Sequence, residues 1–164
     1  MKRRFALLGV TAAASALVVG ASMAMAAQPP AKSLVAVLNA DEEVPTCALA
    51  TNAARGVAVL HVRDEASGTV EFQIISNNLP GDIIAAHIHI APRGVAGPIV
   101  QALPPTPGAE NGVIAEGSFS NAALVAAIRL NPDNYYINVH TDPVNGCPPG
   151  VIRGQLGDRG PLNQ

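Results

Sequence analysis

Three histidines lie in two short apolar segments, at a spacing that suits metal binding. The first segment reads Ala-Ala-His-Ile-His-Ile over residues 85–90. Alternate side chains of a β-strand point to the same face, so His87 and His89 would share a face, about 6.6 Å apart along the strand. Ile88 and Ile90 would then face the core. The segment therefore predicts a strand with two imidazoles on one side.

The second segment, residues 135–140, would place Tyr136, Asn138 and His140 on one face. If the two strands are neighbours, three imidazoles and an amide converge. Three imidazoles are enough to bind copper or zinc and leave one coordination position open. The alternative is that these histidines only hydrogen-bond loops and backbone carbonyls. His87, His89 and His140 are thus a hypothetical metal site, with Asn138 as a candidate for ligand binding or for supporting the metal ligands.

Arg153 is the other candidate for ligand binding. Its guanidinium could meet an anion beside the histidines, or it could pair with an acidic residue of the run 41–43 as a structural clamp. The clamp is favoured because Arg–carboxylate pairs commonly tie loops together. The acidic run is also a minor candidate for calcium. His61 alternates with Val57 and Val59 and is interpreted as structural or surface.

Motifs of common enzymes do not occur in the sequence. It contains no Gly-x-Ser-x-Gly, no phosphate-binding glycine loop and no His-Glu-x-x-His. No catalytic residue is therefore assigned. A non-enzymatic role is favoured, and the question of an activity stays open.

Short strands separated by turn residues make up most of the chain. One short helix is expected over 121–130, capped by Ser120 and stopped by Asn131-Pro132. This pattern predicts an all-β fold, an antiparallel β-sandwich or barrel. The expected form is a sandwich with the Greek-key order of immunoglobulin-like or copper/zinc superoxide dismutase-like domains. The expected strands are 34–38, 56–63, 69–76, 83–90, 99–103, 113–119, 135–140 and 151–156.

The N-terminus has the three parts of a secretory signal peptide. Lys2, Arg3 and Arg4 precede an apolar stretch, and Ala24-Met25-Ala26 offers a cleavage site. Cleavage after Ala26 would leave 138 of the 164 residues and change the formal net charge from −2 to −5. The expected parts are a leader (1–26), a linker (27–32), one domain (33–156) and a tail (157–164). We expect a secreted or periplasmic protein with no stable membrane anchor after cleavage.

Both cysteines, Cys47 and Cys147, lie in the part that would be exported. An even number of cysteines in an exported chain favours a disulfide, although two free thiols or an intermolecular bond are the alternatives. The mature chain has no basic patch, which argues against nucleic acid as a partner.

Five ordered motifs resemble the CHRD domain, a module named for its repeats in chordin. Together they span about residues 33–156. The loop after His-x-His departs from the family in lacking the usual glycine, and Val151 replaces its usual acidic residue. The motifs are Ala40-Asp41-Glu42-Glu43-Val44-Pro45, Ala85-Ala86-His87-Ile88-His89, Gly97-Pro98-Ile99-Val100, Tyr136-Ile137-Asn138-Val139-His140-Thr141 and Gly150-Val151-Ile152-Arg153-Gly154-Gln155-Leu156.

This resemblance implies an extracytoplasmic β-sandwich from a single-domain bacterial protein, acting as a binding or structural module without established catalysis. Its ligand or partner is not named by the resemblance. A weaker resemblance, to copper/zinc superoxide dismutases, implies copper ligands at His87, His89 and His140 and a nearby Arg153. That resemblance lacks a fourth copper histidine and a zinc loop. The alternative function is accordingly an extracytoplasmic protein that binds copper or zinc, with redox chemistry as an option at copper.

Overall fold

The computed structural model describes residues 33–157; the predicted leader, the linker and the tail beyond residue 157 lie outside the described residues. All eight expected strands are present, with bounds within one residue of the prediction. Every neighbouring pair is antiparallel, and the order across the sheet is β5-β4-β7-β8-β1-β2-β3-β6. The strands are β1 (Ser33–Asn39), β2 (Arg55–Asp64), β3 (Thr69–Asn77), β4 (Ile83–Ile90), β5 (Ile99–Ala102), β6 (Gly112–Ser120), β7 (Tyr135–Thr141) and β8 (Ile152–Gln155).

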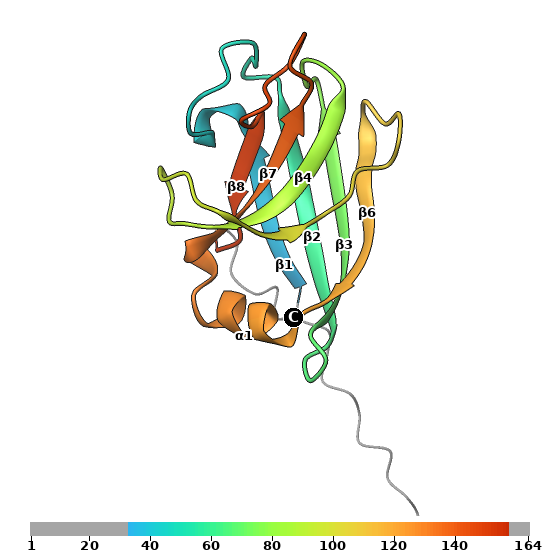
Figure 1. The fold of residues 1–164 in the computed structure, drawn as a ribbon, viewed down its shortest axis with the longest axis vertical. Coiled ribbons are helices and arrows are strands. Elements are labelled where there is room, and N and C mark those ends of the chain that lie inside the picture. Colours follow the sequence, from blue (N-terminus) through green and yellow to red (C-terminus); the bar gives the residue numbers. More distant parts are fainter. Residues whose placement is uncertain (1–32, 158–164) are drawn as a thin grey trace, which may run out of the picture.

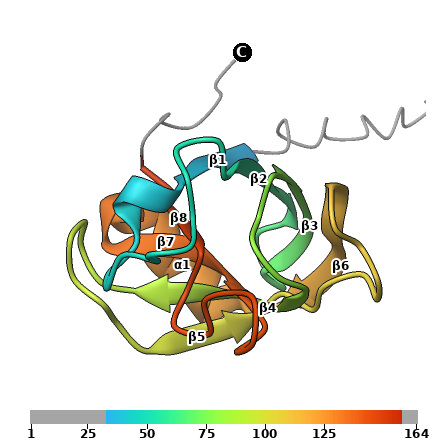
Figure 2. The ribbon, with the colours of Figure 1, turned by 90° about the horizontal axis from the view of Figure 1, so that it is seen from above.

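The eight strands form one sheet that curls around its own core. Seen from above, β4 and β5 come round to face β1 and β2 (Figure 2). The segment after β5 runs on to β6, where Pro105 bridges Ala115 and the Thr106 amide donates to the Ile114 carbonyl at 2.8 Å. The two edges of the sheet are therefore brought together. The all-β class and the single short helix are confirmed, whereas a sandwich of two separate sheets is not.

Alternation along the strands explains the core. In β2 and β3 every second residue is buried, because an amphipathic strand turns one face inward. Leu60, Phe72 and Ile74 are examples of these buried side chains, and Ile88 and Ile137 join them from the opposite wall. The core contains few aromatic rings and is built from aliphatic side chains.

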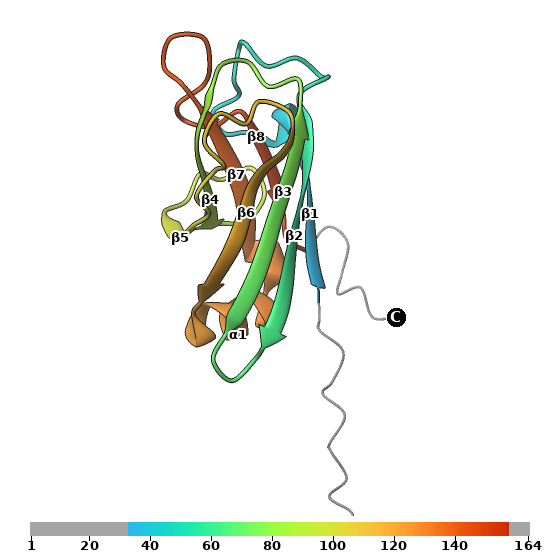
Figure 3. The same ribbon diagram turned by 90° about the vertical axis from the view of Figure 1, so that its right-hand side faces the viewer.

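One end of the curled sheet is covered by α1 (Ala122–Leu130), as Figures 1 and 3 show. Its Leu124, Val125 and Ile128 are buried. The predicted cap, Ser120, is wrong by one residue: Ser120 ends β6, and the Asn121 side chain accepts from the Leu124 amide at 3.1 Å. Asparagine fits this role because its side-chain oxygen reaches a free amide of the first turn. Two short 3-10 turns, η1 (Ala40–Glu42) and η2 (Pro132–Asn134), complete the elements.

Strands β7 and β8 differ from the others because every residue in them is buried. Their inner face contacts the core, so their outer face must be covered by something else. The cover consists of three connections: residues 40–54, 91–98 and 142–150. Hydrogen bonds tie the outer-face side chains of β7 and β8 to all three connections. The loops and the outer face thus enclose a polar layer, and it is here that the histidines lie.

Two details of β4 bear on this layer. Ile88 is buried as expected, but the prediction that Ile90 faces the core is wrong, because its side chain is exposed. Ile90 is the last residue of β4: it still pairs with Tyr135 of β7, and its amide bonds to the Pro98 carbonyl in the loop, so its side chain lies exposed at the end of the strand. Within residues 33–157, no helix has the length and apolar character needed to cross a membrane.

Candidate metal centre

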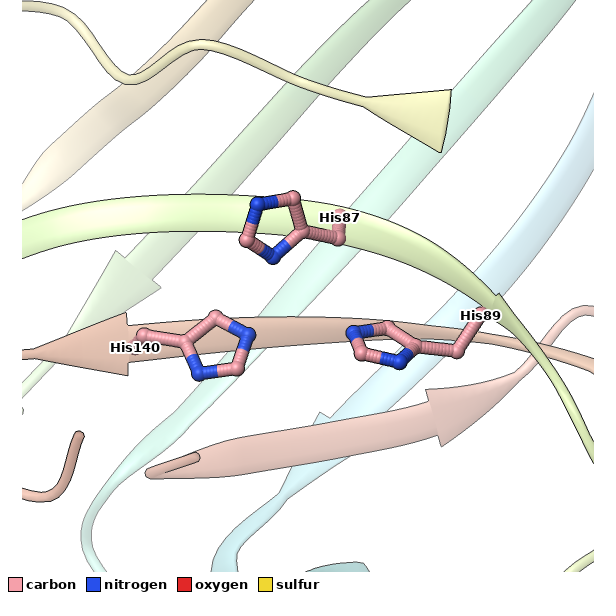
Figure 4. A group of neighbouring side chains, drawn as sticks. All are labelled: His87, His89 and His140. Carbon is pink, nitrogen blue, oxygen red and sulfur yellow. The ribbon is translucent and has the colours of Figure 1, made fainter. Parts of the chain in front are cut away.

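His87, His89 and His140 converge on the outer face of β4 and β7. The two strands are paired, with His87 opposite Asn138 and His140 opposite Ala85. This register places His140 diagonally across from His87. One ring nitrogen from each residue lies within 4.8 Å of the other two. Figure 4 shows these nitrogens turned toward the space between the rings. The convergence expected from the two segments is therefore present.

Backbone carbonyls determine which nitrogen of His89 and His140 faces the others. Nδ1 of His89 lies 2.8 Å from the Gly97 carbonyl, and Nδ1 of His140 lies 2.8 Å from the Pro148 carbonyl. A carbonyl oxygen can only accept, so each Nδ1 must carry the proton and donate it. Each Nε2 is then an unprotonated lone-pair donor. Both Nε2 atoms are buried and have no hydrogen-bond partner.

His87 contributes its other nitrogen. Its Nδ1 is buried without a hydrogen-bond partner and points toward the other two rings (Figure 4). The residue as a whole is only half-buried. The site thus presents three unsatisfied nitrogens, one Nδ1 and two Nε2. Buried polar atoms are normally satisfied, so three unsatisfied nitrogens facing one point require an explanation.

The surroundings of all three imidazoles favour the neutral form over the charged one. Burial, followed by repulsion from His140 and His89, lowers the pKa of His87 to about 4. Burial also lowers the pKa of His89 and of His140, against the opposing effect of their bonds to Gly97 and Pro148. Burial acts in this direction because a low-dielectric environment disfavours the charged imidazolium. Neutral imidazole is the form that binds metal ions.

The loop 91–98 that orients His89 is anchored by Arg153 and Tyr136. Arg153 is completely buried and donates to the carbonyls of Pro92 and Val95, both at 2.9 Å. Its guanidinium lies over the Tyr136 ring, 3.5 Å from the centroid. The Tyr136 ring stacks on His89, with centroids 4.8 Å apart, and its hydroxyl accepts from the Gly97 amide at 3.0 Å. The His89 ring is therefore held both by its hydrogen bond to the Gly97 carbonyl and by stacking on Tyr136.

The loop 142–150 that orients His140 is anchored by the disulfide between Cys47 and Cys147, which confirms the expected intramolecular pairing. The Cys147 amide also donates to the Thr141 hydroxyl at 2.8 Å. Pro148, whose carbonyl meets His140, is the next residue after Cys147. The bridge thus ends one residue away from a group that orients a candidate ligand.

Arg153 does not take the position that either sequence interpretation gave it. Its hydrogen bonds go to loop carbonyls and to Gln155, and full burial leaves it no access to an anion from solution. Glu42 instead pairs with Arg93. Glu43 interacts with Arg153 only through electrostatics, and the residues that Arg153 holds by hydrogen bonds are Pro92, Val95 and Gln155.

Asn138 supports the loops. Its Nδ2 donates to Glu43 Oε1 at 3.3 Å and to the Pro149 carbonyl at 3.5 Å, and its Oδ1 is buried without a partner. Glu43 is 2% exposed. Burial raises the pKa of Glu43 to about 7, against the opposing effects of the Val44 amide, Arg153 and Asn138. The polar layer therefore contains a carboxyl group that titrates near neutral pH.

Other residues considered in the sequence lie elsewhere. His61 is on β2, where its Nδ1 and the Ser33 hydroxyl are 2.6 Å apart, which fits a structural role. Within residues 33–157, the histidine trio is the one group of three or more metal-ligating side chains close enough to hold an ion, and it includes none of the acidic residues 41–43. Sequence reasoning missed Gly97 and Pro148, because a backbone carbonyl leaves no signal in residue type.

Comparison with known proteins gives one result. No curated protein and no solved structure matches the chain. The family model of the CHRD domain matches residues 34–156, which covers nearly all of the described residues and includes all three histidines. CHRD domains are extracellular, and the disulfide is compatible with secretion. Such a match supports a binding or structural module in general terms, and the chain belongs to the CHRD domain family.

Proposed function

We propose that this CHRD domain is an extracytoplasmic binding module whose ligand is a single transition-metal ion, copper or zinc, held by His87, His89 and His140. The observation that carries the proposal is the convergence of three buried nitrogens that have no hydrogen-bond partner. Leaving such atoms unpaired costs about 1–3 kcal/mol each, and a bound cation would recover that cost.

The ring separations support a single ion. A metal–nitrogen bond is about 2.0–2.1 Å, and a ring centroid lies about 1.1 Å behind its nitrogen, so two imidazoles on one ion have centroids about 5 Å apart at a tetrahedral angle and about 6 Å apart when opposite. The observed centroid distances are 4.9, 5.7 and 5.9 Å. All three fall close to this range, so an ion requires only small ring movements.

The surroundings also suit a metal site. Metal-bound histidines usually donate their second nitrogen to a carbonyl or carboxylate, which orients the ring and fixes its tautomer. His89 and His140 have such a bond. We propose further that the protein reaches an oxidising compartment through the leader expected at residues 1–26. A binding role needs no catalytic residue, and none is assigned.

Metal addition to the purified, tag-free protein tests the proposal. Calorimetry with Cu(II) and with Zn(II) should show one ion per chain for the wild type. His140→Ala should abolish binding, and His61→Ala is the matched control that should retain it. In the Cu(II) form of the wild type, pulsed electron paramagnetic resonance should detect the second nitrogen of each coordinated imidazole, the one that does not bind copper. This measurement needs no variant. Absence of stoichiometric binding, or binding that survives His140→Ala, would refute the proposal.

A further inference from the structure

The three imidazoles of the proposed site are not equivalent. His89 and His140 are fixed, because each donates Nδ1 to a loop carbonyl at 2.8 Å and both residues are more than nine-tenths buried. His89 is further held by its stack on Tyr136. His87 is half-buried, and its Nδ1 has no hydrogen-bond partner. Rotation of the His87 ring would therefore break no hydrogen bond at Nδ1, whereas rotation of the other two rings would.

The distances are also unequal. The His87 and His140 rings are 4.9 Å apart, while His89 is 5.7 Å from His87 and 5.9 Å from His140. A zinc ion, which prefers a regular tetrahedron, would separate all three pairs by about 5 Å. The observed pattern instead sets His89 on the far side of the site from the other two rings. His87 and His140 both lie across the site from His89, and of these two only His140 is held in place by a hydrogen bond at Nδ1.

We infer that His89 and His140 form a rigid pair that holds Cu(I) between them, and that His87 is a movable third ligand required for Cu(II) but not for Cu(I). This inference rests on the metal-binding function proposed above and names the ion and its oxidation states. Cu(I) is stable between two nitrogen ligands on opposite sides, whereas Cu(II) prefers a tetragonal arrangement of four or more ligands. Figure 4 shows the inward nitrogens of His89 and His140 directed at one another, with His87 above the gap between them.

The placement of charge agrees with a monovalent ion in the rigid pair. Arg153 is buried behind Tyr136, with its positive charge 3.5 Å from the centroid of the ring that stacks on His89. The same charge opposes any additional cationic charge at the site. A monovalent ion is opposed less than a divalent one.

The His87→Ala variant separates the two oxidation states. Cu(I) affinity is measured without oxygen, by competition with a coloured Cu(I) chelator in ascorbate, and Cu(II) affinity by calorimetry in competition with glycine. We expect the Cu(I) affinity to stay within about threefold of the wild type. The Cu(II) affinity should fall by more than the roughly 10–100-fold typical of losing a group that only supports a ligand.

His89→Ala and His140→Ala should lose both ions, and His61→Ala neither. X-ray absorption spectroscopy at the copper edge counts the nitrogen ligands in the wild type and therefore needs no variant. Cu(I) should have two nitrogen ligands and Cu(II) more than two. Equal losses of Cu(I) and Cu(II) in His87→Ala, or three nitrogens around Cu(I), would overturn the inference and leave the metal site standing. A wild type that binds neither ion would instead overturn the proposed function itself.

Discussion

At the scale of the residue, the most unusual group beside the histidines is Glu43. Its Oε1 accepts from the Val44 amide at 3.0 Å and from Asn138, but its Oε2 is buried without a partner. Burial raises the pKa of Glu43 from 4.5 to about 7. An acid with a raised pKa keeps its proton in the folded state at a pH where the unfolded chain has released it. Its ionisation therefore lowers the free energy of unfolding as the pH rises from 4.5 to 7.

We expect Glu43→Gln to stabilise the domain at pH 8 and to have no effect at pH 4.5. The amide imitates the protonated carboxyl, so the variant avoids an ionisation that costs roughly 3 kcal/mol for this rise in pKa. Urea unfolding at the two pH values measures the difference. Glu110→Gln, at an exposed position, is the control and should change stability at neither pH. A Glu43→Gln variant that is less stable than the wild type at pH 8 would show that the carboxylate is stabilising.

The sequence allowed the three histidines to be predicted because alternation in a strand is local information. His87, His89 and His140 share a face through the two-residue period alone. Their orientation could not be predicted in the same way. The Gly97 and Pro148 carbonyls that set the tautomers belong to loops, and each lies eight residues from its histidine. Ile90 was predicted wrongly because it is the last residue of β4, and alternation gives the face of a side chain but not where burial ends along a strand.

At the scale of the element, the loop 91–98 depends on close contact with β4. A Cβ on Gly97 would lie 2.1 Å from the Ile90 carbonyl oxygen and 2.8 Å from the Ala91 Cβ. Contact at that distance with backbone cannot be relieved by rotating a side chain. The glycine therefore allows the loop to approach the strand closely enough for its carbonyl to meet His89.

Gly97→Ala should weaken metal binding by about 10–100-fold, the usual effect of losing a group that orients a ligand. It should also lower the free energy of unfolding by about 1–3 kcal/mol, as expected when a methyl group is forced into a packed region. Calorimetry with Cu(II) and urea unfolding measure the two effects.

Gly94→Ala is the matched control in the same loop. Gly94 has a positive φ of 75°, but a Cβ there would meet nothing within 4 Å. The control should therefore lose some stability through backbone strain and keep its metal affinity. Equal metal affinities for the two variants would mean that the Gly97 carbonyl does not position His89.

The strands and the helix were predicted more completely than the three connections that cover the outer face of β7 and β8. The strand bounds follow from alternation and turn residues, and the helix follows from its apolar spacing. The outer face of β7 was expected to be polar, and it is, but it is also fully buried. Burial of this face depends on where three long connections fold back. Periodicity does not report that arrangement, because loops bind through backbone groups and through side chains distant in sequence.

At the scale of the whole molecule, the two halves of the sheet have different outer faces. Over β7 and β8 the face is closed by loops, and together with the neighbouring β4 it carries the candidate site. Over β2, β3 and β6 it is open, and Val57, Ile75 and Val113 are about two-fifths exposed. The disulfide belongs to the closed half, where it links residues 100 apart in sequence. It connects two of the three loops that cover the polar layer.

Replacing both cysteines, as Cys47→Ser with Cys147→Ser, should lower the free energy of unfolding by about 2–5 kcal/mol, because a long loop of the unfolded chain is no longer constrained. Metal affinity should fall as well, since the bridge holds the segment whose Pro148 carbonyl orients His140. Thermal unfolding with and without Zn(II) measures both effects, because an ion that binds only the folded state raises its stability by about 2.7 kcal/mol at a hundredfold excess over Kd. The wild type should gain more from the ion than the double variant does. Equal gains would show that the strands alone orient His140, and that the disulfide supports the fold without supporting the site.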